Sequence, residues 1–156
     1  MIIHLVSDLH LEFGYQELPG GDVLILAGDI CEARTLRKEF HQTKVIDRVP
    51  GAFKSYDFFY SECAKYKKVF MVMGNHEHYH GRFDKTYNEL KGMMPDNVTL
   101  LEDECELYEG VLFVGSTLWT DMNKQDGLTL AAIKDDMNDF SLIRNDKRNF
   151  SALRPI

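Results

Sequence analysis

The sequence predicts a single α/β domain built around a parallel sheet. Three short apolar runs, at residues 2–6, 23–27 and 69–73, are rich in Val and Ile, as is usual for parallel strands that are covered on both faces. The order of strands and helical segments along the chain is βαβαβ followed by a hairpin, which is typical of an α/β sandwich. The length of 156 residues fits one domain, and we take residues 1–156 as that domain.

The helices are predicted from the spacing of apolar residues. Over residues 56–64 these recur at i, i+3, i+4, i+7 and i+8, which places them on one helical face. Ser55 is suited to cap the start of that helix. Further helices are predicted near residues 82–91 and over 127–137. Residues 32–50 mix charges with few apolar repeats, and we expect a long excursion over the surface there.

The second half of the chain contains the predicted hairpin. Residues 98–101 are expected to form a fourth strand, and residues 105–108 and 111–115 two more. Glu109 and Gly110 lie between the last two strands and predict a tight turn.

Net charge and cysteine usage argue against several classes of protein. The chain has 18 Lys and Arg against 25 Asp and Glu, a formal charge of −7. A general nucleic-acid coat gains affinity by neutralising phosphates, so nucleic acid is expected only as a substrate. The three cysteines are widely spaced without a C-x-x-C pair, which argues against a thiolate zinc site and favours a reducing, cytoplasmic location. No apolar run is long enough to cross a bilayer, and the N-terminus lacks the features of a signal peptide.

Polar clusters follow the three apolar strands without delay. Asp8 and His10 come directly after the first strand, Asp29 after the second, and Asn75 and His76 after the third. In open α/β sheets, ligands bind just beyond the carboxyl ends of parallel strands. Each motif alone is a common turn sequence, but their joint position at three strand ends predicts that the five side chains converge on one site.

These residue types suit a pair of divalent cations. Asp8 and His10 can bind one cation, and the two carboxylate oxygens of Asp29 allow it to bridge two. The amide oxygen of Asn75 can bind the second cation without cancelling its Lewis acidity. A set of oxygen and imidazole ligands without thiolate favours manganese, iron or zinc-type ions over a structural zinc, and manganese is favoured here.

The motifs Asp8-x-His10, Gly28-Asp29 and Gly74-Asn75-His76-Glu77 resemble those of the calcineurin-like metallophosphoesterase superfamily. The segment at residues 115–119, Gly-Ser-Thr-Leu-Trp, also resembles bacterial and phage members. The match spans roughly residues 2–120.

The resemblance implies a four-layer αββα sandwich and assigns a role to each site residue. Asp8 and His10 would bind the first metal, Asp29 would bridge both metals, and Asn75 would bind the second. His76 would lie beside the substrate phosphate together with Asn75 and act as the catalytic residue. Glu77 would have a structural role.

The chain departs from the family pattern in its second half. Family members carry further histidines downstream, which complete both metal shells. All six histidines of this chain lie within the first 80 residues. We therefore expect residues 1–156 to be a domain truncated on its C-terminal side, with an incomplete second sheet. A partner chain or self-association would then complete that sheet and cover its exposed apolar face.

Other histidines and one cysteine lie near the motifs. His78 and His80 share a side with His76 if that loop is extended, and so are candidates to replace the missing ligands. The alternative is that they open the next helix and line the rim of the cleft. His4 is expected to be a packed core residue. Cys31, two residues after Asp29, is expected to be a structural thiol rather than a group near the metals.

The function predicted is hydrolysis of a phosphate ester, mono- or diester, by water activated by two metal ions. A nucleophilic Ser or Cys is not required for this reaction. The alternative hypothesis is a non-catalytic scaffold or inactive fragment on the same fold.

Overall fold

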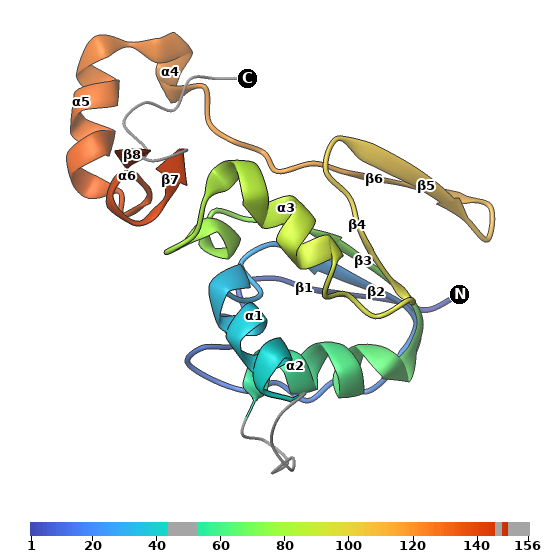
Figure 1. Cartoon of the computed structure of the whole chain (residues 1–156). Coiled ribbons are helices and arrows are strands. Elements are labelled where there is room, and N and C mark those ends of the chain that lie inside the picture. The colour runs from blue at the N-terminus through green and yellow to red at the C-terminus, as the bar shows by residue number, and fades with distance from the viewer. Residues whose placement is uncertain (44–52, 146–147, 150–156) are drawn as a thin grey trace.

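A parallel sheet forms the centre of the molecule (Figure 1). The computed structural model describes residues 1–43, 53–145 and 148–149. The strands lie in sequence order and all neighbours are parallel, with Leu5 opposite Ile25 and Ile25 opposite Phe70. All four strands therefore end at the same edge of the sheet. They are β1 (Ile3–Val6), β2 (Gly21–Ala27), β3 (Tyr66–Val72) and β4 (Val98–Leu100).

Helices cover one face of this sheet (Figure 1). Side chains alternate along each strand, so Leu24 and Leu26 of β2 and Met71 of β3 face the helices, and all three are fully buried. The helical side of this core includes Leu36 and Phe58. The helical layer consists of α1 (Ala33–Gln42), α2 (Lys54–Asp57) with its continuation through η1 (Phe58–Glu62) and η2 (Cys63–Lys65), and α3 (Phe83–Lys91).

A hairpin packs on the opposite face of the sheet. It consists of β5 (Glu104–Tyr108) and β6 (Val111–Gly115). The ring of Phe113 stacks on that of Phe70 with 4.2 Å between centroids, and both side chains are buried. The predicted turn is present, because Tyr108 pairs with Val111.

The outward face of this hairpin is apolar as well. Leu112 and Val114 are 59% and 75% exposed, and Leu5 of β1, on the sheet face beside the hairpin, is 66% exposed. Within the described residues the molecule thus has a helical layer, a parallel sheet and a hairpin layer, with apolar surface left on the hairpin side.

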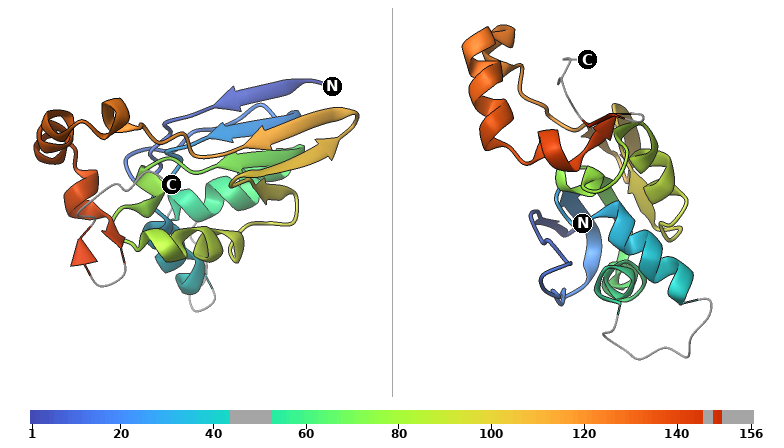
Figure 2. Two further views of the ribbon diagram at one scale, coloured as in Figure 1. Left: turned by 90° about the horizontal axis from the view of Figure 1, so that it is seen from above. Right: turned by 60° about the vertical axis from the view of Figure 1, so that its left-hand side comes forward.

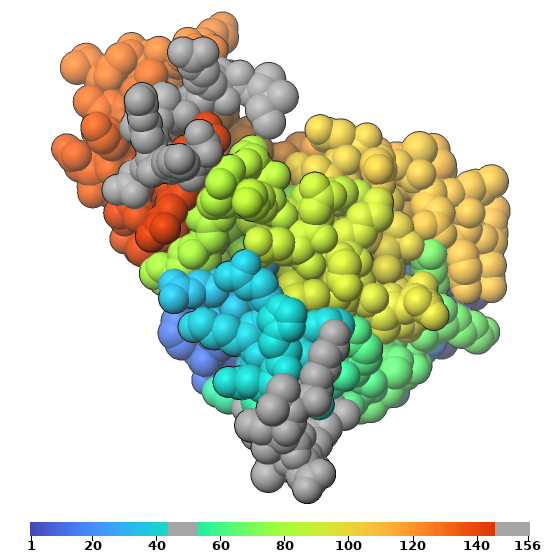
Figure 3. Space-filling model, viewed as in Figure 1, coloured from blue at the N-terminus to red at the C-terminus, as the bar shows by residue number. Residues whose placement is uncertain are grey.

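The C-terminal elements form a lobe beside α3 (Figures 2 and 3). This lobe is joined to the body by backbone hydrogen bonds, because the amide of His80 donates to Leu142 (2.8 Å) and that of Arg144 to Gly81 (3.2 Å). The side chain of Ile143 is fully buried at this junction. The elements of the lobe are α4 (Met122–Gln125), α5 (Gly127–Asp136), α6 (Asp139–Leu142), β7 (Arg144–Asn145) and β8 (Arg148–Asn149).

The predicted α/β class is confirmed, and the βαβαβ order followed by a hairpin holds from β2 onward, whereas the described residues between β1 and β2 contain no helix. The expected surface excursion over residues 32–50 is wrong for its first part, where α1 forms, and its remainder from residue 44 lies outside the described residues. Ala33 and Leu36 of α1 are buried and Phe40 packs against the same core. These three residues follow helical spacing, but the charged residues between them conceal the pattern.

The stack of Phe70 on Phe113 is expected to contribute to the stability of the fold by attaching the hairpin to the sheet. Replacing Phe113 with Ala is expected to lower the free energy of unfolding by about 3 kcal/mol, because it removes a buried ring and leaves a cavity. The matched control is Leu112→Ala, whose side chain points outward on the same strand, and it should cost less than about 1 kcal/mol. Urea unfolding followed by circular dichroism measures both. Equal losses in the two variants would contradict this account of the packing.

Candidate metal centre

Three loops meet at the carboxyl edge of the sheet and carry the residues that the sequence predicted for the site. The loop after β1 is tied to the loop after β2 by backbone hydrogen bonds. The amide of Asp8 donates to Gly28 (3.0 Å) and that of His10 to Asp29 (3.1 Å). The amide of His76, after β3, donates to Oδ1 of Asp29 (2.9 Å). The three strand ends are therefore held together by the backbone and by one carboxylate.

Asp8, His10 and Asp29 all have a left-handed backbone, with φ of 54°, 43° and 54°. Non-glycine residues rarely adopt this conformation, and it persists only where surrounding contacts hold it. Here the hydrogen bonds between the loops supply those contacts. Other non-glycine residues among those described also have a positive φ, but at this edge of the sheet three of them converge.

Two glycines allow the loops to approach so closely. Gly28 has a φ of +90°, which a residue with a Cβ rarely adopts. A Cβ on Gly74 would overlap the carboxylate of Asp29. Both glycines precede a predicted site residue, so they determine where Asp29 and Asn75 are placed.

Glu77 lies beneath these loops and is completely buried. Its carboxylate accepts three backbone hydrogen bonds, from Ile30 (2.7 Å), Gly74 (2.7 Å) and Asp29 (3.1 Å). Burial raises the pKa of Glu77 to about 7, while the backbone donors act in the opposite direction. The side chain contacts the loops rather than the open side of the site, which fits the structural role expected for it.

The grouping of ligand atoms fits a divalent cation. One ligand atom from each of Asp8, His10 and Asp29 lies within 4.8 Å of the others. Carboxylate and imidazole donors of this kind suit manganese, iron or zinc. A second group of the same compactness contains His10, Glu12 and His76. Glu12 was not predicted from the sequence, although it continues the alternation of Asp8 and His10 in the same loop.

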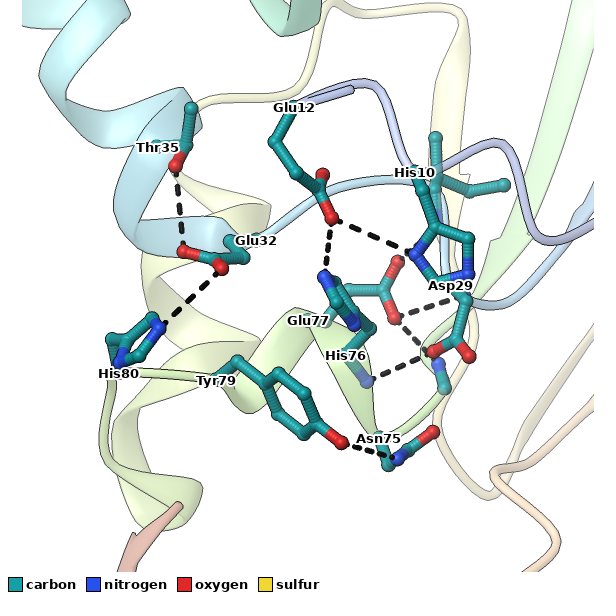
Figure 4. Close-up of polar contacts among 12 residues, drawn as sticks. His10, Glu12, Asp29, Glu32, Thr35, Asn75, His76, Glu77, Tyr79 and His80 are labelled. Atoms are coloured by element: carbon teal, nitrogen blue, oxygen red, sulfur yellow. Dashed lines mark hydrogen bonds and ion pairs between the residues drawn. The ribbon is translucent and has the colours of Figure 1, made fainter. Parts of the chain in front are cut away.

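The side chain of Asn75 is fixed by the C-terminal lobe. Its amide nitrogen donates to Oδ1 of Asp139 (2.7 Å) and lies 3.2 Å from the hydroxyl of Tyr79 (Figure 4). The same Oδ1 accepts a hydrogen bond from Tyr79 (2.8 Å). Because the nitrogen is engaged, the amide oxygen is the atom left to bind a cation. Asp139 lies 64 residues further along the chain, so no local pattern identifies this contact.

The ring of His76 lies between two other rings. Its centroid is 4.5 Å from that of His10, edge to face, and 4.5 Å from that of Tyr79. Its Nε2 is in direct contact with the carboxylate of Glu12 (Figure 4). The side chain is 14% exposed. His76 therefore occupies the wall of the site next to the first group of ligands.

The structure separates the other candidates from the site. His78 is buried and stacks on Phe83, with 4.7 Å between ring centroids. His80 is partly exposed and lies 3.7 Å from Glu32. Neither belongs to the compact ligand groups found among the described residues. They occupy the turn η3 (His76–His78) and the residues before α3, rather than the start of that helix.

The remaining predictions for single residues concern the interior. His4 packs edge-on to the ring of Tyr66 and contacts its hydroxyl through Nδ1 (2.9 Å), but its side chain is half-buried and lies outside the core clusters of the described residues. Cys31 is completely buried, and burial raises the pKa of its thiol well above the usual value. That environment is typical of a structural thiol.

The segment at residues 115–119 crosses the ends of two strands. The hydroxyl of Thr117 donates to the carbonyl of Met73 at the end of β3 (2.8 Å) and contacts the carboxylate of Glu102 after β4 (3.0 Å). Trp119 packs its ring near those of His78 and Phe83. The segment thus joins the hairpin to the loop that carries Asn75 and His76.

The fold is consistent with that of the metallophosphoesterases. The family model for calcineurin-like phosphoesterases matches residues 1–149, and the chain belongs to that family. It therefore has the family's α/β fold, and membership in the family supports a metal-binding type of site and a phosphoesterase type of function.

One relative of the chain is a viral protein. The chain is 27% identical over 157 aligned positions to an uncharacterized protein of Acanthamoeba polyphaga mimivirus. The alignment covers 95% of this chain but 54% of the viral protein. The chain thus spans about half the length of the curated relative it matches. Among the helices of the described residues, none is both long and apolar enough to span a membrane.

Burial of His78 predicts a dependence of stability on pH. Burial lowers its pKa from 6.5 to about 4 in the folded chain. Between these pH values the unfolded chain binds a proton there that the folded chain does not, so stability falls as the pH falls. The loss approaches about 3 kcal/mol, and His78→Phe should remove this part of it.

The measurement is urea unfolding at pH 7 and at pH 4. The control is His41→Phe, because the side chain of His41 is exposed, and it should retain the pH dependence of the wild type. Parallel loss of stability in the wild type and in His78→Phe would show that His78 is not the group responsible.

Proposed function

We propose that the protein is a metal-dependent phosphoesterase that hydrolyses a phosphate ester with water. The observation that carries this proposal is the compact grouping of Asp8, His10 and Asp29 at the carboxyl edge of the parallel sheet. Family membership supports the class of reaction. We propose a phosphate monoester or diester as the substrate and specify no other part of it.

The proposal gives each ligand a place. Asp8 and His10 would hold one cation, Asp29 would be shared between it and a second, and Asn75 would hold the second through its amide oxygen. The contact of the Asn75 nitrogen with Asp139 supports this orientation of the amide. Two divalent cations, with manganese favoured, supply Lewis acidity that activates water and neutralises phosphate charge.

His76 is proposed as the catalytic residue, and with Asn75 it binds the substrate. Its position beside His10 places an imidazole next to the proposed metals. There it can donate a hydrogen bond to a phosphate oxygen or a proton to the leaving oxygen. In the overall reaction a new P–O bond to water forms, the bond to the leaving oxygen breaks, and the leaving group takes up one proton.

The alternative is a non-catalytic scaffold on the same fold. The observation that favours it is that residues 81–156 contain no histidine to complete the two metal shells. In both cases we propose that residues 1–156 belong to one domain of a cytoplasmic protein. A partner chain or second copy that completes the second sheet is also proposed, and the exposed apolar side chains of the hairpin support that view.

Asp29 separates the two candidate functions. Asp29→Ala should abolish Mn²⁺-dependent hydrolysis of bis-p-nitrophenyl phosphate, a loss of at least about a hundredfold, because both cations lose their shared ligand. The assay follows release of p-nitrophenol with and without MnCl₂. Asp135→Ala is the control, since Asp135 is exposed on α5, and it should keep the activity of the wild type.

The outcomes differ between the two candidates. Activity that survives in Asp29→Ala would contradict the proposed metal site. Absence of activity in the wild type together with Mn²⁺ binding that Asp29→Ala weakens would favour the scaffold.

A further inference from the structure

We propose that Glu12 is a positioning residue that holds the rings of His10 and His76 in the orientations needed for binding metal and substrate. This inference rests on the proposed function of the site. Glu12 belongs to the second compact group of side chains, with those two histidines. It is distinct from the proposed metal ligands and from Glu77, which contacts only backbone amides in the hydrogen bonds described above.

The carboxylate of Glu12 is enclosed by the site. The side chain is 13% exposed, and both of its oxygens are buried without a regular hydrogen bond among the described residues. Removing a carboxylate from water is costly unless partners compensate it. Two imidazoles face it: Nδ1 of His10 at 3.5 Å and Nε2 of His76 in direct contact. These rings are thus the groups through which Glu12 acts.

The backbone fixes where Glu12 points. Leu11 is fully buried, and its amide donates to the carbonyl of Ile30 (2.9 Å). The amide of Phe13 closes a turn onto the carbonyl of His10 (2.8 Å). Glu12 therefore lies between two residues whose backbone is held by hydrogen bonds. The loop is fixed at this point, and the carboxylate of Glu12 is directed at the two rings.

The contact with His10 has a direct chemical consequence. Figure 4 shows Nδ1 of this ring turned to Glu12 and the opposite edge of the ring turned toward Asp29. A carboxylate beside Nδ1 favours the tautomer with the proton on Nδ1. Nε2 then presents its lone pair to a cation shared with Asp8 and Asp29. Outer partners of this kind typically contribute a factor of about 10–100 to metal affinity.

The contact with His76 acts in the same way on the second ring. Glu12 engages Nε2, and the rings of His10 and Tyr79 restrict rotation from either side. With Nε2–H turned to the carboxylate, Nδ1 is the nitrogen left to face a phosphate oxygen, and it donates to that oxygen only when the ring is protonated. One carboxylate consequently aligns a metal ligand with the residue proposed to meet the substrate.

The experiment compares the metal-free full chain with Glu12→Gln, which keeps the shape of the side chain but removes its charge. Long-range ¹H–¹⁵N spectra of the histidine rings report the tautomers directly. We expect one dominant Nδ1–H form of His10 in the wild type and a mixture in the variant. Titration with MnCl₂ alone, followed by electron paramagnetic resonance, should show weaker binding in Glu12→Gln by about 10–100-fold. Glu12→Asp should recover part of this loss.

The matched control is Glu17→Gln, because Glu17 is exposed in the same loop, and it should behave as the wild type in both measurements. Thermal unfolding of each variant separates misfolding from a change at the site.

Unchanged tautomers in a folded Glu12→Gln variant would overturn the proposal. Loss of a whole equivalent of Mn²⁺ with unchanged tautomers would make Glu12 a metal ligand instead. Failure of the wild type to bind Mn²⁺ would contradict the proposed function, while the spectra would still decide the role of Glu12.

Discussion

The site depends on one buried carboxylate that binds backbone amides. Glu77 accepts hydrogen bonds from the loops after β2 and β3, at Asp29, Ile30 and Gly74. Burial of a carboxylate is costly, and the amide donors offset part of that cost. This arrangement sets the distance between two strand ends before any cation binds. The left-handed backbone of Asp29 is held in part by this contact.

The acidic side chains near Glu77 have different roles, which depend on the groups that each one contacts. Glu77 contacts backbone, Glu12 contacts imidazole rings, and Asp139 contacts an amide and a phenol. Asp8 and Asp29 each have a carboxylate oxygen within the compact group of ligand atoms that also includes His10. The role of each carboxylate is therefore determined by the hydrogen-bond donor that it contacts, more than by the number of carboxylates in the site.

Much of the fold and part of the site could be predicted from the sequence. Apolar runs before Asp8, Asp29 and Asn75 indicate buried strands, and parallel strands bring their carboxyl ends to one edge. The contacts of Glu12 and Asp139 could not be predicted, because they depend on side-chain direction and on a segment far along the chain. Helix α1 was missed because charged residues separate its few apolar positions. The roles of the individual site residues remain predictions.

The contact between Asn75 and Asp139 has a thermodynamic consequence. Asp139 belongs to α6, and the lobe that carries it is joined to the body through short backbone contacts near Gly81. Docking of this lobe and the proposed binding of a ligand at Asn75 therefore share one hydrogen-bonded amide. Linkage requires that the effect of one on the free energy of the other is equal in both directions. A molecule that binds or displaces the C-terminal lobe would thus change the affinity of the site for its ligand without entering the site.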